Sequence, residues 1–387
     1  MKTLFLLLLV GCYRLNSEKQ EKKSLSILLS AIPAPGHYLN FIILGNALKE
    51  QGHNVTLLML QFKDYNKPKE LCEERGLYYI PIPVNVSYHD FKAKVNNNDL
   101  KSFVQVLSGT LYSFFSSMSS FISNELDTSE IDIVVTQEFL MGSFLCTMNE
   151  DLPIIFVSAS VLIDPSLLPS WPFPHIAFSS ITHDTSITDR FMITAARNFL
   201  LAPIQKLIVW YMSSYNPECW ERKYNYYLPP GHAAPYIAAT VIGFEYPRTN
   251  LPLVDYVGPF IPNTLDPLPS DIDLWLKSKK ENSVVYISMG SILTGSQKFA
   301  EALYNGIPSN YSVLWSATNK TILKGIENEL NNNRFLIKSW IPQISALNHS
   351  SISLAILHGG AGGVHQALYF GIPIIVIPLS PGDQSSN

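Results

Sequence analysis

Residues 351–378 read SISLAILHGGAGGVHQALYFGIPIIVIP, and their pattern predicts the architecture of the chain. An apolar run at 353–357 reaches a glycine-rich turn, a helix is expected from residue 363, and residues 374–377 form a second apolar run. Short apolar runs that alternate with helices predict parallel strands with helices on both faces. Further elements of the same kind are expected upstream, namely strands at 284–289, 312–317 and 335–338 and a helix from 297.

The first half of the chain shows the same alternation. An apolar run at 26–31 ends at a turn rich in proline, and residues 38–51 predict a helix that stops before Gly52. We therefore predict an α/β fold of two doubly wound, Rossmann-like domains that face a cleft. The remaining elements expected in this half are strands at 54–60, 79–83, 131–136 and 153–159 and a helix at 102–126.

Composition indicates the boundary between the two halves and limits the classes of molecule that the chain can bind. The segment 254–270 holds five Pro or Gly residues and few charges, which is typical of a linker. Hydrophobic residues make up 47% of the chain and charged residues 15%, so large buried cores are expected and disorder is not. The net charge of −4, without a basic run, excludes nucleic acid as an expected partner. The predicted divisions are a signal peptide at 1–17, an N-terminal domain at 24–255, a linker at 256–282 and a C-terminal domain at 283–387.

The N-terminal residues predict entry into the secretory pathway. Met1-Lys2 and the apolar residues 4–10 are typical of a signal peptide, and the run is too short to span a bilayer. With Cys12 in the signal, the other three cysteines allow at most one disulfide. Residues 199–212 are expected to pack in the core or to touch a membrane surface as an amphipathic helix. Triplets that suit N-glycosylation begin at Asn54, Asn85, Asn310, Asn319 and Asn348.

Residues around the glycine-rich turn suit a nucleotide. Backbone N–H groups at a helix start favour a diphosphate, and Gly359, Gly360 and Gly363 provide such a start. His358 at the same turn can donate to a phosphate oxygen. Taken singly, however, a glycine-rich turn and a histidine beside it more often have a structural role.

Other residues of the C-terminal half suit the base and the sugars. Trp340 offers a flat face to a nucleobase, and Gln343 and Gln366 offer amides to ribose hydroxyls. Asp383 and Gln384 follow a strand end, where ligands bind in such sheets, and suit the hydroxyls of a sugar.

The run from Trp340 to Gln384 resembles the signature of the UDP-glycosyltransferase family, and the chain is similar to UDP-glucuronosyltransferases in particular. The family's Trp-x-Pro-Gln, His-x-Gly and Asp-Gln are all present, and Gly290-Ser291 matches its Gly-Ser turn near the donor phosphates. The resemblance implies a GT-B fold and a UDP-sugar as donor substrate, with no metal and no separate cofactor. It also implies an acceptor-binding N-terminal domain for a small lipophilic compound with a hydroxyl group.

The turn that ends in Gly36-His37 resembles the family's Gly-His turn, which implies His37 as the general base. The alternative is that His37 only caps the helix behind it. In the family an Asp usually holds this base, but Gln137 stands at that position. Its amide oxygen is expected to orient His37 without carrying charge. Glu138 is adjacent, but neighbouring strand residues point to opposite faces.

Other departures from the family concern the donor side and the end of the chain. Gly362 stands where an Asn is common, and Gln366 where a Glu is common. The sequence stops three residues after Gln384, so the second domain is expected to be incomplete, either as a gene fragment or as a natural truncation.

We expect inverting transfer of a hexosyl or glucuronosyl group to a hydroxyl acceptor, with the endoplasmic reticulum lumen as the location, or secretion if the truncation is natural. The alternative is a catalytically impaired UDP-sugar-binding protein. A dinucleotide oxidoreductase is disfavoured, because no G-x-G-x-x-G follows the first strand.

Overall fold

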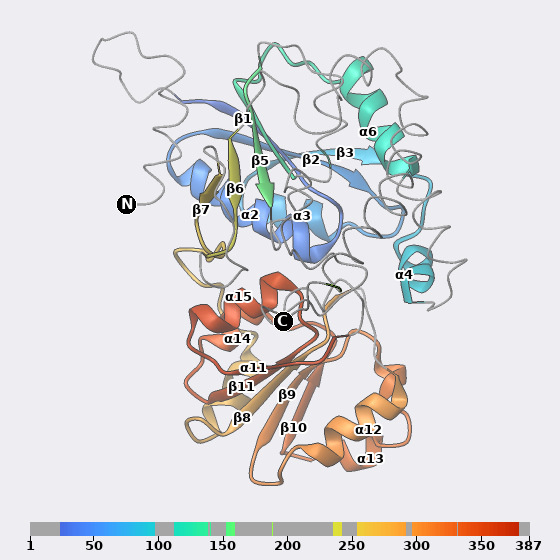
Figure 1. Cartoon of the computed structure of the whole chain (residues 1–387), viewed down its shortest axis with the longest axis vertical. Coiled ribbons are helices and arrows are strands. Elements are labelled where there is room, and N and C mark those ends of the chain that lie inside the picture. Colours follow the sequence, from blue (N-terminus) through green and yellow to red (C-terminus); the bar gives the residue numbers. More distant parts are fainter. Residues whose placement is uncertain are drawn as a thin grey trace.

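Two parallel sheets, each flanked by helices, make up the part of the chain that the computed structural model describes (Figure 1). The predicted two-sheet α/β architecture is confirmed. The described residues are 24–96, 112–137, 140, 152–158, 188, 235–241, 254–291, 296–330 and 332–378. The predicted signal peptide and the segment 170–227, apart from residue 188, lie outside them.

The strands of the first sheet are β1 Ser26–Ser30, β2 Asn54–Gln61, β3 Tyr78–Pro83, β4 Ile133–Gln137, β5 Ile154–Ser158, β6 Tyr236–Ala238 and β7 Val254–Tyr256. Among the described residues they run in parallel in the order β3-β2-β1-β4-β5-β6-β7. The sequence predicted β1 to β5 within about two residues at each end. It did not predict β6 and β7, because a three-residue strand is too short for a recognisable pattern.

Helix α2 (Pro35–Glu50) follows β1 and begins earlier than predicted. Proline suits the first turn of a helix, because its fixed φ is helical and its missing N–H has no partner there in any case. The buried side chains of α2 include Tyr38 and Phe41, which pack with Leu29 of β1. The other helices described beside this sheet are α3 Lys67–Glu74, α4 Tyr88–Asn96 and α6 Tyr112–Asn124.

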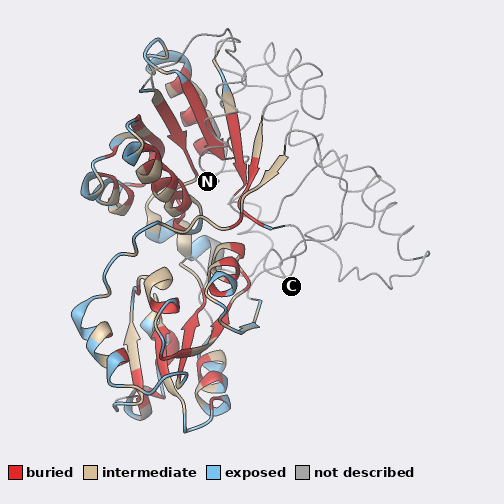
Figure 2. Ribbon diagram, turned by 90° about the vertical axis from the view of Figure 1, so that its left-hand side faces the viewer, coloured by how far each residue is buried: buried red, intermediate tan, exposed pale blue. Residues whose placement is uncertain are grey.

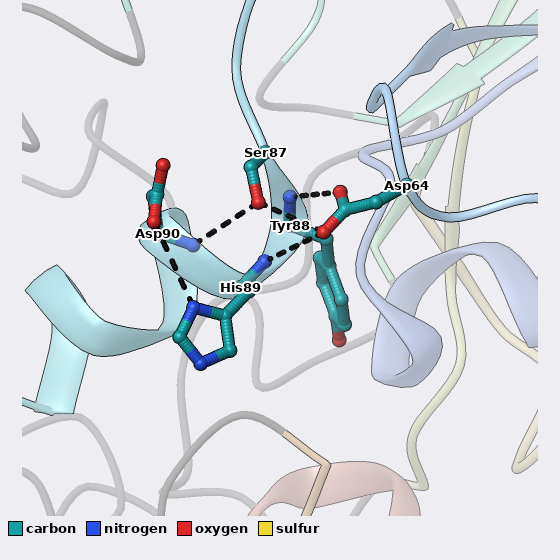
Figure 3. Close-up of polar contacts among 5 residues, drawn as sticks. All are labelled: Asp64, Ser87, Tyr88, His89 and Asp90. Atoms are coloured by element: carbon teal, nitrogen blue, oxygen red, sulfur yellow. Dashed lines mark hydrogen bonds and ion pairs between the residues drawn. The ribbon is translucent and has the colours of Figure 1, made fainter.

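The start of α4 is held by a carboxylate from a different loop. The Asp64 side chain accepts hydrogen bonds from the Tyr88 backbone N–H (2.5 Å) and from the Ser87 hydroxyl (2.8 Å), and a longer one from the His89 backbone (Figure 3). These donors, the Tyr88 N–H first, lower the pKa of Asp64 below its ordinary value. An acceptor for the unpaired N–H groups of a first turn stabilises the helix, so Asp64 fixes where α4 begins.

The second sheet contains β8 Val284–Ser288, β9 Ser312–Ser316, β10 Phe335–Lys338, β11 Ile352–Leu357 and β12 Ile374–Val376. Its strands are also parallel, in the order β10-β9-β8-β11-β12. Helix α12 (Gln297–Gly306) begins at the predicted residue, where the Ser296 hydroxyl accepts from the Phe299 N–H. The other helices described here are α11 Ser270–Lys277, α13 Glu327–Leu330, α14 Gln343–Leu347, α15 Ala361–Tyr369 and the 3₁₀ helix η4 Lys320–Leu323.

The predicted linker, 256–282, is shorter in the structure. Helix α11 lies inside it, and its Ile272 and Leu276 are buried in the core that contains Val284 and Leu314 of the second sheet. The Pro-rich stretch before α11 makes polar contacts with both halves of the chain. The Asp266 side chain pairs with Arg75 (2.6 Å), and its carbonyl oxygen accepts from Ser345 of α14 (2.7 Å).

The strands of each sheet are largely buried and lie at the centre of their own half of the described part (Figure 2). In each sheet, the strand order extends from the first strand to one side and then continues on its other side, and this change occurs at equivalent places in the two sheets. In the first sheet the change lies between β1 and β4, and in the second between β8 and β11. Ligands of parallel α/β sheets bind beside the carboxyl ends of the strands at such a switch point. No helix in the described residues is both long and apolar enough to span a membrane.

Candidate functional site

Two predicted turns meet at the switch point of the second sheet. Gly290 follows β8 and His358 follows β11, and these two strands are hydrogen-bonded neighbours. A Cβ on Gly290 would lie 2.9 Å from Cε1 of His358, and one on Gly360 would lie 2.5 Å from its Nε2. Gly290 and Gly359 also have positive φ angles, of 81° and 98°. The His358 ring therefore lies between two glycines, where any larger residue would collide with it.

The glycine-rich turn runs directly into α15, with Gly360 as the residue before its first turn. Gly360 has no side chain with which to cap this helix, so the N–H groups at its start and the positive end of its dipole suit an anion. Gly363 lies in this first turn, where an added Cβ would approach Nε2 of Gln343 to 3.3 Å. Ser291 is half-buried in the turn after β8. This arrangement suits a diphosphate.

The two predicted ribose-binding amides form one chain of hydrogen bonds. The Tyr286 hydroxyl donates to Oε1 of Gln343 (3.2 Å), and Nε2 of Gln343 donates to Oε1 of Gln366 (2.7 Å). Tyr286 is 1% exposed, and burial raises the pKa of its hydroxyl, which therefore keeps its proton. The sequence analysis missed Tyr286, because its hydroxyl was hidden within an ordinary apolar strand.

Trp340 lies between β10 and α14 and is 48% exposed, whereas its neighbour Ile341 is 3% exposed. A large aromatic side chain that is half open to solvent, beside a fully buried one, can offer a face to a ligand. Asp383 and Gln384 lie outside the described residues.

His37 lies at the switch point of the first sheet, as the third residue of α2. The residue before this helix is Ala34, whose side chain makes no capping hydrogen bond, and His37 lies inside the first turn, so the capping alternative for His37 is not what the structure shows. Instead, the ring contacts Gln137, the last residue of β4. Burial lowers the pKa of His37 to about 4, and the nearby helix start acts in the same direction. His37 is therefore neutral near pH 7.

Gln137 faces His37 with a different atom from the one expected. Its Oε1 accepts a hydrogen bond from the backbone N–H of Ile32 (3.2 Å), and its Nε2 contacts Nδ1 of His37. The expectation that the amide oxygen orients His37 is therefore wrong. The reason is a backbone donor in the loop after β1, which takes the oxygen.

A row of aromatic side chains extends from the residue next to His37. The hydroxyls of Tyr38 and Tyr65 are 2.8 Å apart, and the Tyr65 ring stacks on Tyr88 with 4.1 Å between ring centroids. Phe62 packs against Tyr88 in turn. Because Asp64 fixes the start of α4, it also fixes Tyr88 in this row (Figure 3).

One buried hydrogen bond joins the two halves of the site. The Thr240 hydroxyl, just after β6, lies 3.0 Å from Nε2 of His365 in α15. The two residues are 0% and 4% exposed. The helix behind the glycine-rich turn is thereby tied to the end of the first sheet. Among the described residues, no three His, Cys, Asp or Glu side chains gather closely enough to hold a metal ion.

The sequence from residue 26 to 387 matches the family described as "UDP-glucoronosyl and UDP-glucosyl transferase". The chain belongs to this family of UDP-glycosyltransferases. It is 24% identical to UDP-glucuronosyltransferase 2B9 of Macaca fascicularis over 91% of this chain and 70% of the relative. A shorter region is 35% identical to human UDP-glucuronosyltransferase 2B17, over 41% of this chain and 29% of the relative.

Solved structures agree with the assignment of the fold. The glycotransferase of kitacinnamycin has a TM-score of 0.62 at 16% identity, over 94% of this chain and 83% of that protein. UGT89C1 of Arabidopsis thaliana, complexed with UDP-L-rhamnose, has a TM-score of 0.58 at 17% identity, over 95% and 82%. The UDP-glycosyltransferase chain therefore has the GT-B fold that its sequence predicted.

Proposed function

We propose that this chain transfers a hexosyl or glucuronosyl group from a UDP-sugar to an oxygen of a small lipophilic acceptor. The observation that carries the proposal is the position of His358 between Gly290 and Gly360, at the uncapped start of α15. The two glycine turns leave room for the His358 ring beside the start of this helix, where it can donate to a charged group. Membership of the UDP-glycosyltransferase family supports UDP as the carrier of that group.

On the donor side, each part of the nucleotide has a matching group. Trp340 stacks on uracil, and Gln343 with Gln366 contacts the ribose. The backbone N–H groups at the start of α15, together with Gly290, Ser291 and His358, hold the diphosphate. Asp383 and Gln384 are proposed to hold the sugar hydroxyls. UDP-sugar is a substrate in this scheme, and no metal or further cofactor is invoked.

On the acceptor side, the oxygen lies near His37. It attacks the anomeric carbon from the face opposite UDP, the bond to the diphosphate breaks, the configuration inverts, and any proton that the acceptor oxygen carried is released to solvent. UDP leaves with the bonding electrons, and the helix start with His358 stabilises the developing negative charge. The half-buried rings of Tyr65 and Tyr88, which stack on each other, favour a lipophilic acceptor.

The alternative is a catalytically impaired UDP-sugar-binding protein, and the Gln137 amide favours it because the partner of His37 carries no charge. Release of free UDP separates the two. The full chain is incubated with UDP-glucose or UDP-glucuronate and a panel of phenols and carboxylic acids. Transfer predicts acceptor-dependent UDP release. UDP binding without release supports the binding protein, and the absence of both contradicts the assigned donor site.

We further propose that the chain enters the secretory pathway, most simply the endoplasmic reticulum lumen. Residues 1–17 support this as a signal peptide, and the exposed Asn310 and the half-exposed Asn319 are the proposed glycosylation sites. Oδ1 of Asn319 already accepts from the hydroxyl and the N–H of Thr321, within the same triplet. Expression in animal cells should give a product whose mass falls on glycosidase treatment. An unglycosylated cytosolic product would contradict the proposal.

A further inference from the structure

The orientation of the Gln137 amide is fixed by its surroundings. Gln137 is 0% exposed, so both ends of its amide need partners within the protein. The backbone N–H of Ile32 is a donor, and of the two amide atoms only Oε1 can accept from it. A flipped amide would place its own N–H groups against the Ile32 N–H. The amide nitrogen therefore faces Nδ1 of His37.

This orientation decides which ring nitrogen of His37 carries the proton. An amide NH₂ is a donor, so Nδ1 has to accept with its lone pair. The proton of the neutral ring then lies on Nε2. A general base that acts through Nε2 needs the other tautomer, with the proton on Nδ1 and held by a carboxylate. In a serine protease, an amide in place of that carboxylate gives the wrong tautomer and costs about 10⁴ in rate.

We propose that Gln137 holds His37 in the Nε2–H tautomer, so that this chain uses acceptors whose oxygen is already anionic. The inference rests on the proposed function and deepens it, because it names the acceptor class. His37 then donates a hydrogen bond to the acceptor oxygen and positions it, and no proton has to leave. Carboxylates and the more acidic phenols fit this site, and neutral alcohols do not.

The reaction balances without a base. A carboxylate oxygen forms a bond to the anomeric carbon with its own electron pair, and the bond from that carbon to the diphosphate oxygen breaks. UDP takes the electrons of the broken bond. The products are a glycosyl ester with inverted configuration and UDP, and His37 keeps its Nε2 proton throughout.

Gln137→Glu is the sharpest change, because it keeps the shape of the side chain and replaces only the amide. One carboxylate oxygen still accepts from Ile32, and the other now accepts from Nδ1–H of His37. The tautomer reverses, and Nε2 becomes able to take a proton. Gln137 is thus a positioning residue, and Gln51→Glu, at the opposite end of α2, is the control for added charge.

The tautomer is read directly by nitrogen-15 NMR of the full chain labelled at histidine, with the His37 signals identified by their loss in His37→Gln. At neutral pH the wild type should show a protonated Nε2 and an unprotonated Nδ1. Gln137→Glu should show an unprotonated Nε2 and a protonated Nδ1. A wild-type ring protonated on Nδ1 overturns the proposal. The wild-type result does not depend on turnover or on whether Gln137→Glu folds.

The acceptor class is tested with benzoate and benzyl alcohol, which share a ring and differ in the ionisation of the oxygen. The wild type should glycosylate benzoate and leave benzyl alcohol almost untouched. Gln137→Glu should raise transfer to benzyl alcohol by roughly 10²–10⁴-fold, the usual contribution of a general base, while Gln51→Glu should not. Equal wild-type transfer to both acceptors overturns this inference alone. Transfer to neither overturns the proposed function as well.

Discussion

Gln137 at the end of β4 and Gln366 within α15 are the same kind of change in the two halves of the molecule, and their consequences are opposite. Each stands near a switch point, and each replaces a carboxylate that is common in the family. Gln366 turns its oxygen toward Gln343 and keeps the hydrogen bond that a carboxylate would make. Gln137 turns its nitrogen toward His37, because Ile32 takes the oxygen. An amide can replace a carboxylate as an acceptor only where no other donor already occupies the amide oxygen.

In the proposed function, nucleotide binding belongs to the second switch point and acceptor chemistry to the first. Variants at the two places should therefore change different quantities. Those at the second should change the affinity for UDP, and those at the first should change turnover alone.

The largest effect is expected from His37→Ala. Loss of a donor to the reacting oxygen should lower turnover by roughly 10²–10³-fold, whereas UDP affinity should not change. Steady-state UDP release and calorimetry with UDP measure the two quantities. His89→Ala is the matched control, because His89 is an exposed histidine on α4. A parallel loss of UDP affinity in His37→Ala would mean that the two switch points do not act separately.

The next effect concerns the glycines beside His358. Gly360→Ala and Gly290→Ala should displace the ring, and the lost hydrogen bond to a charged phosphate should weaken UDP binding by about 1.5–3 kcal/mol. Gly306→Ala, at the end of α12, is the control, because nothing lies within 4 Å of an added Cβ there. That variant should bind UDP normally and gain up to about 1 kcal/mol of helix stability. Normal UDP affinity in all three variants would remove His358 from the diphosphate site.

Trp340→Ala should weaken UDP binding by about 1–3 kcal/mol, the value of stacking between a base and an aromatic ring. Trp340→Phe should keep most of the affinity. Trp275→Ala, on α11, should leave UDP binding unchanged, although its indole N–H donates to Asn333. Calorimetry measures the UDP affinity of all three variants. Equal affinities in Trp340→Ala and the wild type would exclude Trp340 as the residue that stacks on uracil.

The smallest effect should come from Gln366→Glu. Hydrogen bonds to a charged group are stronger than neutral ones, so a carboxylate here should accept a stronger hydrogen bond from a ribose hydroxyl, and UDP affinity should rise by roughly 1 kcal/mol. Gln51→Glu adds the same charge in the first half of the chain and should have no effect. A fall in affinity would show that the ribose needs the amide donor of Gln366.

The sequence predicted most of the fold because the strands at its centre are short apolar runs that end in glycine- or proline-rich turns. The strand at 335–338 is found at its predicted bounds. Where the prediction was wrong, local pattern was weak. β7 and α11 lie in the segment 254–282, which resembled a linker because of its prolines. Pairing with β6 places β7 in the first sheet, and packing in the core that contains Val284 places α11 beside the second sheet.

The candidate site was predictable as a set of residues but not as a set of atoms. His358 and Gly290 could be placed together, because both follow parallel strands. The pairing of His37 with Gln137, 100 residues away, followed from the family resemblance. The backbone N–H of Ile32 determines which atom of the Gln137 amide faces His37. The position of a backbone N–H cannot be predicted from a pattern of side chains.

The central claim is that UDP binds at the switch point of the second sheet and does not contact the backbone at that of the first. Hydrogen exchange of the full chain, measured by mass spectrometry with and without UDP, tests it most directly, because bound backbone N–H groups exchange more slowly. UDP should protect residues 289–291 and 358–366 and leave residues 35–40 unchanged. Protection at residues 35–40, or none in the two turns beside His358, would contradict the account.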